Sequence, residues 1–150
     1  LYDTKAGEEC ACEFHSGFGC GAAYLTVMGS ASPNTSALCY QETNEIQHMV
    51  IDLTDVPEEQ IRLIDGDEDA IYLVHHNNDL GTKINATKMV ATFHKLHPAV
   101  KHIAVAGGID LDNAQRLRMQ GIAEIVVVGG KISGAAFAEG AARSFREIIK

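Results

Sequence analysis

The sequence has little positive charge and no long apolar run. It holds 12 lysine and arginine residues against 20 aspartate and glutamate residues, so its formal net charge is −8. An acidic surface argues against nucleic acid or an anionic membrane as the partner, although a small phosphorylated ligand needs only a local positive site. No apolar run approaches a membrane span, and no charged segment precedes an apolar one as in a signal peptide. These absences predict a cytoplasmic protein that binds neither nucleic acid nor membrane.

Low-complexity segments and linkers are also lacking. The 150 residues, 46% hydrophobic and 21% charged, predict a single domain over residues 1–150. Four cysteines lie near the N-terminus, and three of them could form a metal cluster with His15. Their spacing matches no common zinc pattern, and cysteine also packs well as a small buried residue, so we favour packing. The cysteines are Cys10, Cys12, Cys20 and Cys39.

Short apolar runs instead alternate with helix-like stretches along the chain. The runs are rich in Val and Ile and apolar on both faces, as are buried strands of parallel sheets. Expected strands cover residues 23–29, 48–54, 70–76, 102–108 and 124–130. Expected helices cover residues 35–43 (weakly), 57–64, 83–96, 112–120 and 135–149, with Asp110 and Gly121 at the ends of the fourth. Three glycines in five residues weaken a helix over Cys10–Gly21.

The alternation predicts an α/β fold with parallel strands and right-handed crossovers. Two architectures remain open, a doubly wound sheet and part of a (β/α)8 barrel. In both, ligands bind at the carboxyl ends of the strands.

Two glycine pairs end the last two expected strands. They are Gly107-Gly108 in "AVAGGID" and Gly129-Gly130 in "VVVGGKI". Glycine allows a close backbone approach, and the N–H groups at a following helix start favour an anion. The alternative is a pair of tight turns. Because the pairs occupy equivalent places on successive strands, we favour a phosphate site.

Three further groups of polar residues stand near strands. Asp52 lies inside the apolar run "VIDLT", where a carboxylate is costly unless it is paired or bound. His75, followed by Asp79, ends another strand, where it can exchange a proton or remain a surface histidine. In "YDTKAGEE", a strand would place Asp3 and Lys5 on one face, although a charged N-terminus is the simpler interpretation.

Taken together, these elements resemble the orotidine-monophosphate-decarboxylase-like (β/α)8 enzymes. Within that group the chain is similar to the 3-hexulose-6-phosphate synthases and the 3-keto-L-gulonate-6-phosphate decarboxylases. The D-x-K-x-x-D strand motif of the group stands here as Asp3, Lys5 and Glu8, with Glu in place of the last Asp. The runs "LTVMG", "VIDLT", the H-x-x-x-D of His75 and Asp79, "VAGGIDLDNAQ" and "VVVGGKISGAA" follow in the expected order.

The resemblance implies a lyase that needs Mg²⁺ and acts on a phosphorylated sugar as a homodimer. Asp3 would bind Mg²⁺, Lys5 would contact substrate oxygens, and His75 would transfer a proton at the reacting carbon. Glu8 would reach the neighbouring subunit's site, and Asp52 would hydrogen-bond substrate hydroxyls. Further substrate contacts would come from Asn78, Asp79 and Ala106, and phosphate contacts from Gly107, Gly108, Gly129 and Gly130.

Four departures from the decarboxylase pattern lean towards the synthase. Asn78 stands where that pattern has Arg, Ala106 where it has Thr, Gly130 where it has Arg, and Asp52 where it has Glu. The resemblance therefore implies condensation of formaldehyde with ribulose 5-phosphate. Decarboxylation, or phosphate binding without catalysis, are the alternatives.

An eight-stranded barrel needs two βα units more than the about six expected here. We therefore expect an incomplete barrel. It is either a piece of a longer chain, a remnant completed by a partner, or a decayed copy.

Overall fold

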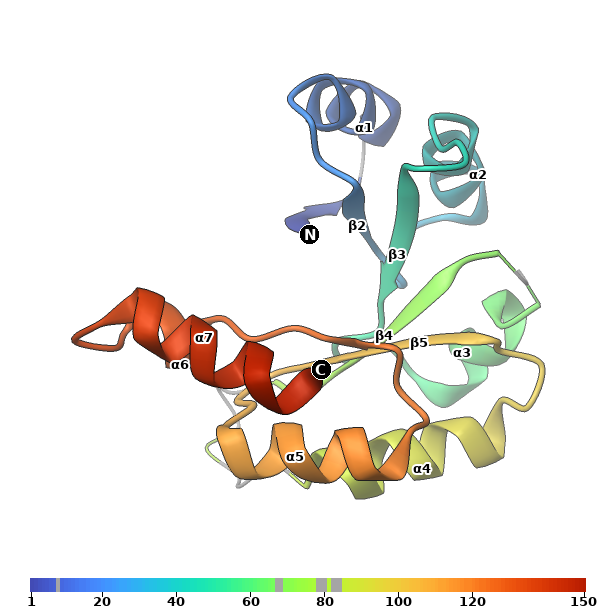
Figure 1. Cartoon of the computed structure of the whole chain (residues 1–150). Helices are drawn as coiled ribbons and strands as arrows, with labels where there is room; N and C mark the ends of the chain where they lie inside the picture. The colour runs from blue at the N-terminus through green and yellow to red at the C-terminus, as the bar shows by residue number, and fades with distance from the viewer. Residues whose placement is uncertain (8, 67–68, 78–80, 82–84) are drawn as a thin grey trace. The chain divides into compact units, whose positions relative to one another are not determined.

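A computed structural model describes residues 1–7, 9–66, 69–77, 81 and 85–150. Backbone hydrogen bonds connect six parallel strands in the order β1-β2-β3-β4-β5-β6, with helices between them (Figure 1). The predicted α/β class and its parallel sheet are confirmed. The strands are β1 (Tyr2–Ala6), β2 (Tyr24–Met28), β3 (His48–Asp52), β4 (Ile71–His75), β5 (His102–Ala106) and β6 (Ile125–Val126). The helices are α1 (Cys10–Gly19), α2 (Pro33–Gln41), α3 (Glu58–Ile64), α4 (Ala86–Leu96), α5 (Leu111–Gln120), α6 (Gly130–Ser133) and α7 (Ala138–Ile149).

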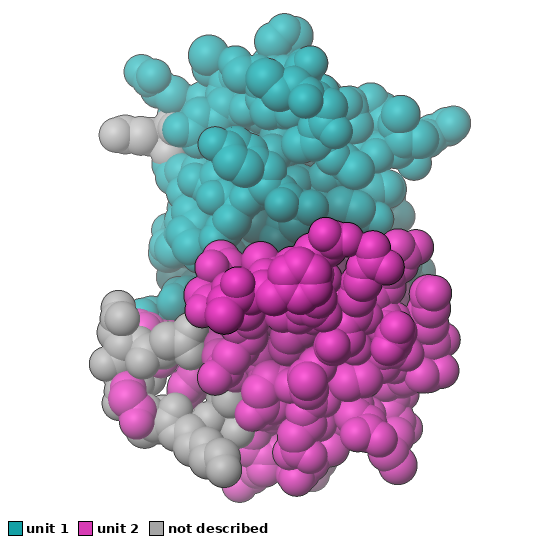
Figure 2. Space-filling model, turned by 60° about the vertical axis from the view of Figure 1, so that its left-hand side comes forward, with its two compact units in different colours: residues 1–73, 99–102 teal, residues 74–98, 103–150 magenta. Residues whose placement is uncertain are grey.

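The chain divides into two compact units, coloured separately in Figure 2. The first unit holds residues 1–73 and 99–102, and its interior is made by β1, β2, β3 and the first part of β4 with their helices. The second unit holds residues 74–98 and 103–150, where α5 packs against both α4 and α7. Among the described residues, no helix is long and apolar enough to cross a bilayer.

Helix α1 forms despite its glycines, contrary to the expectation from composition. Cys10, Phe14 and Phe18 recur every four residues and are all buried. The two phenylalanine rings meet edge to face with their centroids 5.5 Å apart. Burying an apolar stripe of this kind outweighs the roughly 1 kcal/mol that each helical glycine costs.

The last predicted strand is shorter than expected. Pairing with β5 covers Ile125 and Val126, and the backbone then turns into the short helix α6 before α7. The apolar run over 124–130 overstated the strand because the Gly129-Gly130 pair already belongs to the start of α6.

The ends of α5 agree with the prediction. The Asp110 carboxylate accepts hydrogen bonds from the backbone N–H and the side-chain amide of Asn113, both at 2.8 Å. The backbone N–H of Asn113 is the main reason why the pKa of Asp110 lies below its ordinary value. Gly121 ends the helix in the left-handed conformation with a φ of 69°.

Removing the Asp110 cap is expected to destabilise the protein in a pH-dependent way. In Asp110→Ala, the free energy of unfolding at pH 7 should fall by about 1 kcal/mol. A carboxyl with a lowered folded-state pKa stabilises fully above its unfolded pKa, near pH 4, and loses this stabilisation as pH falls through the folded value. Urea melts should therefore show the difference shrinking below about pH 4. Asp110→Asn keeps an acceptor and should stay close to the wild type, and equal losses in both variants would contradict the capping role.

Candidate active site

An irregular stretch of β1 brings the first two predicted site residues together. Tyr2 pairs with Leu25 and Ala6 with Val27, so four steps along β1 match only two along β2. Thr26 thus stands alone opposite residues 3–5. Lys5 has a φ of 49°, which is uncommon for a residue other than glycine. Lys5 Nζ lies 3.6 Å from Asp3 Oδ2. The two side chains share a region as predicted, but the cause is this bulge and not regular alternation.

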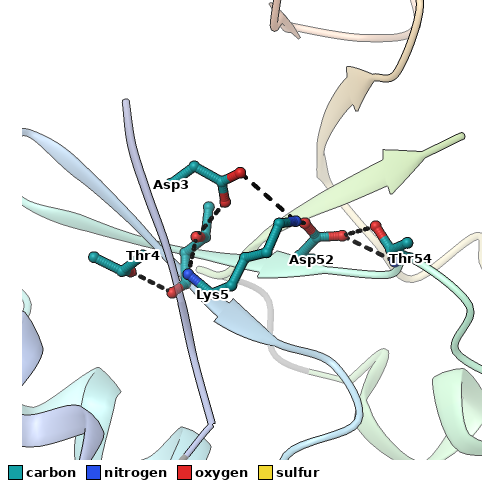
Figure 3. Close-up of polar contacts among 6 residues, drawn as sticks. Asp3, Thr4, Lys5, Asp52 and Thr54 are labelled. Atoms are coloured by element: carbon teal, nitrogen blue, oxygen red, sulfur yellow. Dashed lines mark hydrogen bonds and ion pairs between the residues drawn. The ribbon is translucent and has the colours of Figure 1, made fainter. Parts of the chain in front are cut away.

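Asp52 at the end of β3 holds the other side of the Lys5 ammonium. Its side chain is 0% exposed, and Oδ2 forms a short ion pair with Lys5 Nζ (Figure 3). Oδ1 accepts from the backbone N–H of Thr54 at 2.8 Å and from its hydroxyl at 2.5 Å. The predicted burial of Asp52 is confirmed, and Lys5 and Thr54 offset its desolvation. Because both oxygens are engaged within the chain, Asp52 fixes the position of Lys5, and its contact with substrate stays a prediction.

Thr26 is a part of this cluster that sequence reasoning missed. Its hydroxyl donates to Asp3 Oδ1 at 2.7 Å and accepts the backbone N–H of Lys5 at 2.8 Å. Its carbonyl accepts from the Thr4 hydroxyl at 2.6 Å. In the run "LTVM", a β-branched threonine is equally typical of an ordinary buried strand. The available signal was a polar group inside an apolar strand. The same kind of signal, in the stronger form of a carboxylate, singled out Asp52.

Asp3 offers a carboxylate, the ligand type that Mg²⁺ prefers, but it belongs to no cluster of metal ligands among the described residues. Its side chain is 46% exposed, with Oδ1 bound by Thr26 and Oδ2 beside Lys5. Within the described ranges, no three His, Cys, Asp or Glu side chains gather as a metal site. Magnesium is commonly held by one or two carboxylates with water and substrate oxygens. Asp3 would suit such an ion only as a single carboxylate, and its metal role stays a prediction.

A cavity of about 710 Å³ lies beside β1 and α1 in the first unit. Asp3 is the predicted site residue that lines it, with Tyr2, Thr4 and residues of α1 such as Glu13 and Ser16. Lys5 and Asp52 do not line it, so this cavity does not enclose the ion pair.

The predicted residues of the second unit include His75, Ala106 and Gly107. His75 is the last residue of β4, and the N–H of the next residue, His76, donates to the Ala106 carbonyl at 3.1 Å. Gly107 follows with a φ of 92°, and a β-carbon there would lie 2.2 Å from the His76 carbonyl oxygen. Gly107 is therefore required by close packing between the ends of β4 and β5, whatever it binds.

The other glycine pair differs from the first. Gly129 and Gly130 precede and begin α6, and a β-carbon on either would meet nothing within 4 Å. Packing therefore does not require glycine at either position, and the phosphate role of this pair stays a prediction. The next residue, Lys131, contributes to the lowered pKa of Asp110 through its positive charge, after the Asn113 hydrogen bonds and against desolvation. Sequence reasoning did not single out Lys131, whose charge acts on Asp110 at the start of α5.

The structure thus assembles the predicted residues in two groups. Asp3, Lys5 and Asp52 are joined in the first unit. His75, Ala106 and the glycine pairs belong to the second unit. Glu8, Asn78 and Asp79 lie outside the described residues.

The cysteines divide into buried Cys10 and Cys39 and exposed Cys12 and Cys20, and burial is the main cause that raises the pKa of Cys39.

Parallel strands with helices between them are the architecture of the (β/α)8 barrels, and the solved structures agree. The structural neighbours of the chain are barrels of the orotidine-monophosphate-decarboxylase-like group and match nearly all of it, which confirms the resemblance. No protein-family model matches the sequence, and no curated protein does either.

Three neighbours are the most informative. The 3-hexulose-6-phosphate synthase from Salmonella typhimurium is 27% identical with a TM-score of 0.81, covering 98% of this chain and 71% of that one. A second 3-hexulose-6-phosphate synthase is 26% identical with a TM-score of 0.78, covering 99% and 72%. The KGPDC from Streptococcus mutans is 23% identical with a TM-score of 0.74, covering 98% and 70%. The last likeness concerns the fold alone.

Proposed function

We propose that the chain is an aldehyde-lyase that condenses formaldehyde with D-ribulose 5-phosphate to form D-arabino-3-hexulose 6-phosphate. The observation that carries the proposal is the Lys5 ammonium, paired with the buried Asp52 and 3.6 Å from the Asp3 carboxylate. A cation fixed before the reaction stabilises negative charge that develops on substrate oxygens. The similarity to two 3-hexulose-6-phosphate synthases at 27% and 26% identity supports this choice.

The proposed reaction forms one carbon–carbon bond through an enediolate. A proton leaves C1 of ribulose 5-phosphate, C1 attacks the formaldehyde carbon, and the new alkoxide takes up a proton. His75 is assigned the proton transfer, since imidazole gains and loses a proton near neutral pH. Lys5 is assigned the stabilisation of negative charge on the substrate oxygens. The two turns that contain the glycine pairs are assigned the binding of the phosphate group. Asp3 would hold Mg²⁺, which when bound supplies further positive charge for those oxygens.

We propose the active form as a homodimer, in which Glu8 reaches the neighbouring subunit's site. The resemblance carries this assignment, and Glu8 lies outside the described residues.

Removing the metal should abolish the condensation. Formaldehyde consumption with ribulose 5-phosphate is expected to stop in EDTA and to return with excess Mg²⁺. Circular dichroism recorded in both states should coincide, so that the loss of turnover is not a loss of fold. Turnover that persists in EDTA would contradict the metal assignment.

The runner-up reaction is decarboxylation of 3-keto-L-gulonate 6-phosphate. Asn78, Ala106, Gly130 and Asp52 each depart from the decarboxylase pattern, so we expect CO₂ release to be far slower than formaldehyde consumption. A faster CO₂ release would assign the chain to the decarboxylase reaction instead.

Gly129→Val tests the phosphate assignment. A β-carbon there meets nothing within 4 Å, so thermal stability should change little. The larger side chain would obstruct the backbone N–H groups at the start of α6, and the Kd for ribulose 5-phosphate should rise about tenfold or more, the loss of one charge-assisted hydrogen bond. His75→Ala should keep binding and lose turnover. If the wild-type protein binds ribulose 5-phosphate but shows no turnover, the non-catalytic alternative is favoured.

A further inference from the structure

Thr26 is the one residue of β2 that faces the irregular part of β1. Where Tyr2 and Ala6 are four residues apart, their partners Leu25 and Val27 are two apart, and Thr26 stands between them. Its side chain is 0% exposed. A bulge of this kind removes backbone groups from the regular ladder, and buried groups left without a partner are costly.

The Thr26 hydroxyl forms hydrogen bonds with two residues of this bulge, Asp3 and Lys5. Thr26 Oγ1 accepts the backbone N–H of Lys5 at 2.8 Å and donates its own proton to Asp3 Oδ1 at 2.7 Å. The Lys5 backbone it holds has a φ of 49°, a conformation that persists only where the surroundings enforce it. The Thr4 hydroxyl donates to the Thr26 carbonyl at 2.6 Å and so holds the same part of β1 to the backbone of β2.

The other end of Lys5 is held independently. Its ammonium pairs with Asp52, whose carboxylate is also bound by Thr54. Lys5 is thus fixed at its backbone by Thr26 and at its tip by Asp52. The Asp3 carboxylate has Thr26 as its hydrogen-bond donor and Lys5 as its ionic partner at 3.6 Å.

We propose that Thr26 is a positioning residue, whose single hydroxyl sets the Asp3 carboxylate and the Lys5 backbone in register with each other. Its effect on turnover rests on the proposed function, while its effect on the bulge does not. Outer hydrogen-bond partners of this kind typically contribute 10–100-fold to activity or metal affinity.

Thr26→Val and Thr26→Ser separate the hydroxyl from the packing. Valine has nearly the same shape and suits a strand, but it neither accepts the Lys5 N–H nor donates to Asp3. Serine keeps the hydroxyl and loses a methyl group. Thr43→Val is the matched control, because it removes a hydroxyl that donates to the Tyr40 carbonyl at 2.7 Å in the same unit.

Two measurements are made on each variant. In Thr26→Val, kcat for formaldehyde condensation should fall about 10–100-fold, with a change in KM for ribulose 5-phosphate below about threefold. Hydrogen exchange of the Lys5 amide, followed by NMR, should accelerate about tenfold or more because its acceptor is gone. Thr26→Ser and Thr43→Val should stay within about threefold of the wild type in kcat.

Unchanged Lys5 exchange in Thr26→Val would overturn the proposal. So would an equal loss of kcat in the valine and serine variants, because packing would then explain the effect. A wild-type protein without turnover would refute the proposed function instead. The Lys5 exchange rates would in that case decide alone whether Thr26 organises the bulge.

Discussion

Lys5→Met is expected to slow turnover severely and to destabilise the fold at the same time. The ammonium lies 3.6 Å from the Asp3 carboxylate, and losing such a preorganised charge costs roughly 10²–10³-fold in kcat. The same substitution leaves the Asp52 carboxylate 0% exposed without its cation. Breaking a buried pair costs about 3–5 kcal/mol, and we expect about 3 kcal/mol because the Lys5 side chain is 39% exposed.

The double variant Lys5→Met with Asp52→Asn separates the two effects. Asparagine keeps an oxygen for Thr54 and carries no charge, so the double variant should recover more than half of the lost free energy of unfolding. Its turnover should stay as low as that of Lys5→Met. Lys88→Met, which removes an exposed lysine, serves as the control in urea melts and in the formaldehyde assay. A Lys5→Met protein as stable as the control would contradict the buried pair.

Gly107→Ala is expected to lower the free energy of unfolding strongly, although it adds only one methyl group. The new β-carbon would lie 2.2 Å from the His76 carbonyl oxygen, and the backbone φ is 92°. The positive φ costs roughly 1–2 kcal/mol and the overlap a further 1–3 kcal/mol, for a total of about 3 kcal/mol. The backbone must shift at the turn after β5, where Gly107 lies against His76 at the end of β4, so ribulose 5-phosphate binding should weaken too.

Gly121→Ala is the matched control for backbone conformation. Its φ is 69°, and a β-carbon there meets nothing within 4 Å. It should therefore show only the conformational cost, about 1 kcal/mol in thermal or urea melts. If the two alanine variants melt alike, the close approach between Gly107 and His76 has no energetic consequence, and the packing role of Gly107 is wrong.

The features that the sequence predicted well depend on local chemistry. Asp52 lies between Ile51 and Leu53 in an apolar run, and the burial cost of its charge already demanded a partner. The Asp110 cap and the Gly121 stop follow from hydrogen-bonding and backbone preferences within a few residues. Such local rules do not depend on knowing which strand lies alongside.

The features that escaped prediction depend on a neighbouring strand. The bulge in β1 exists because Thr26 of β2 offers a hydroxyl to Asp3 and Lys5, and neither strand signals this pairing alone. Gly107 was predicted to bind phosphate, whereas its contact with His76 gives it a packing requirement that spacing along the chain does not reveal. Helix α1 likewise depends on tertiary burial of Phe14 and Phe18, which overrides weak helix propensity.

The most direct test of the proposed reaction is NMR of [¹³C]formaldehyde mixed with ribulose 5-phosphate, Mg²⁺ and the protein. The account predicts that the label moves into a new carbon–carbon bond of a hexulose 6-phosphate, at the same rate with the wild type and Lys88→Met and roughly 10²–10³-fold more slowly with Lys5→Met. Label that stays in formaldehyde with the wild-type protein, or that moves equally fast with Lys5→Met, would contradict it.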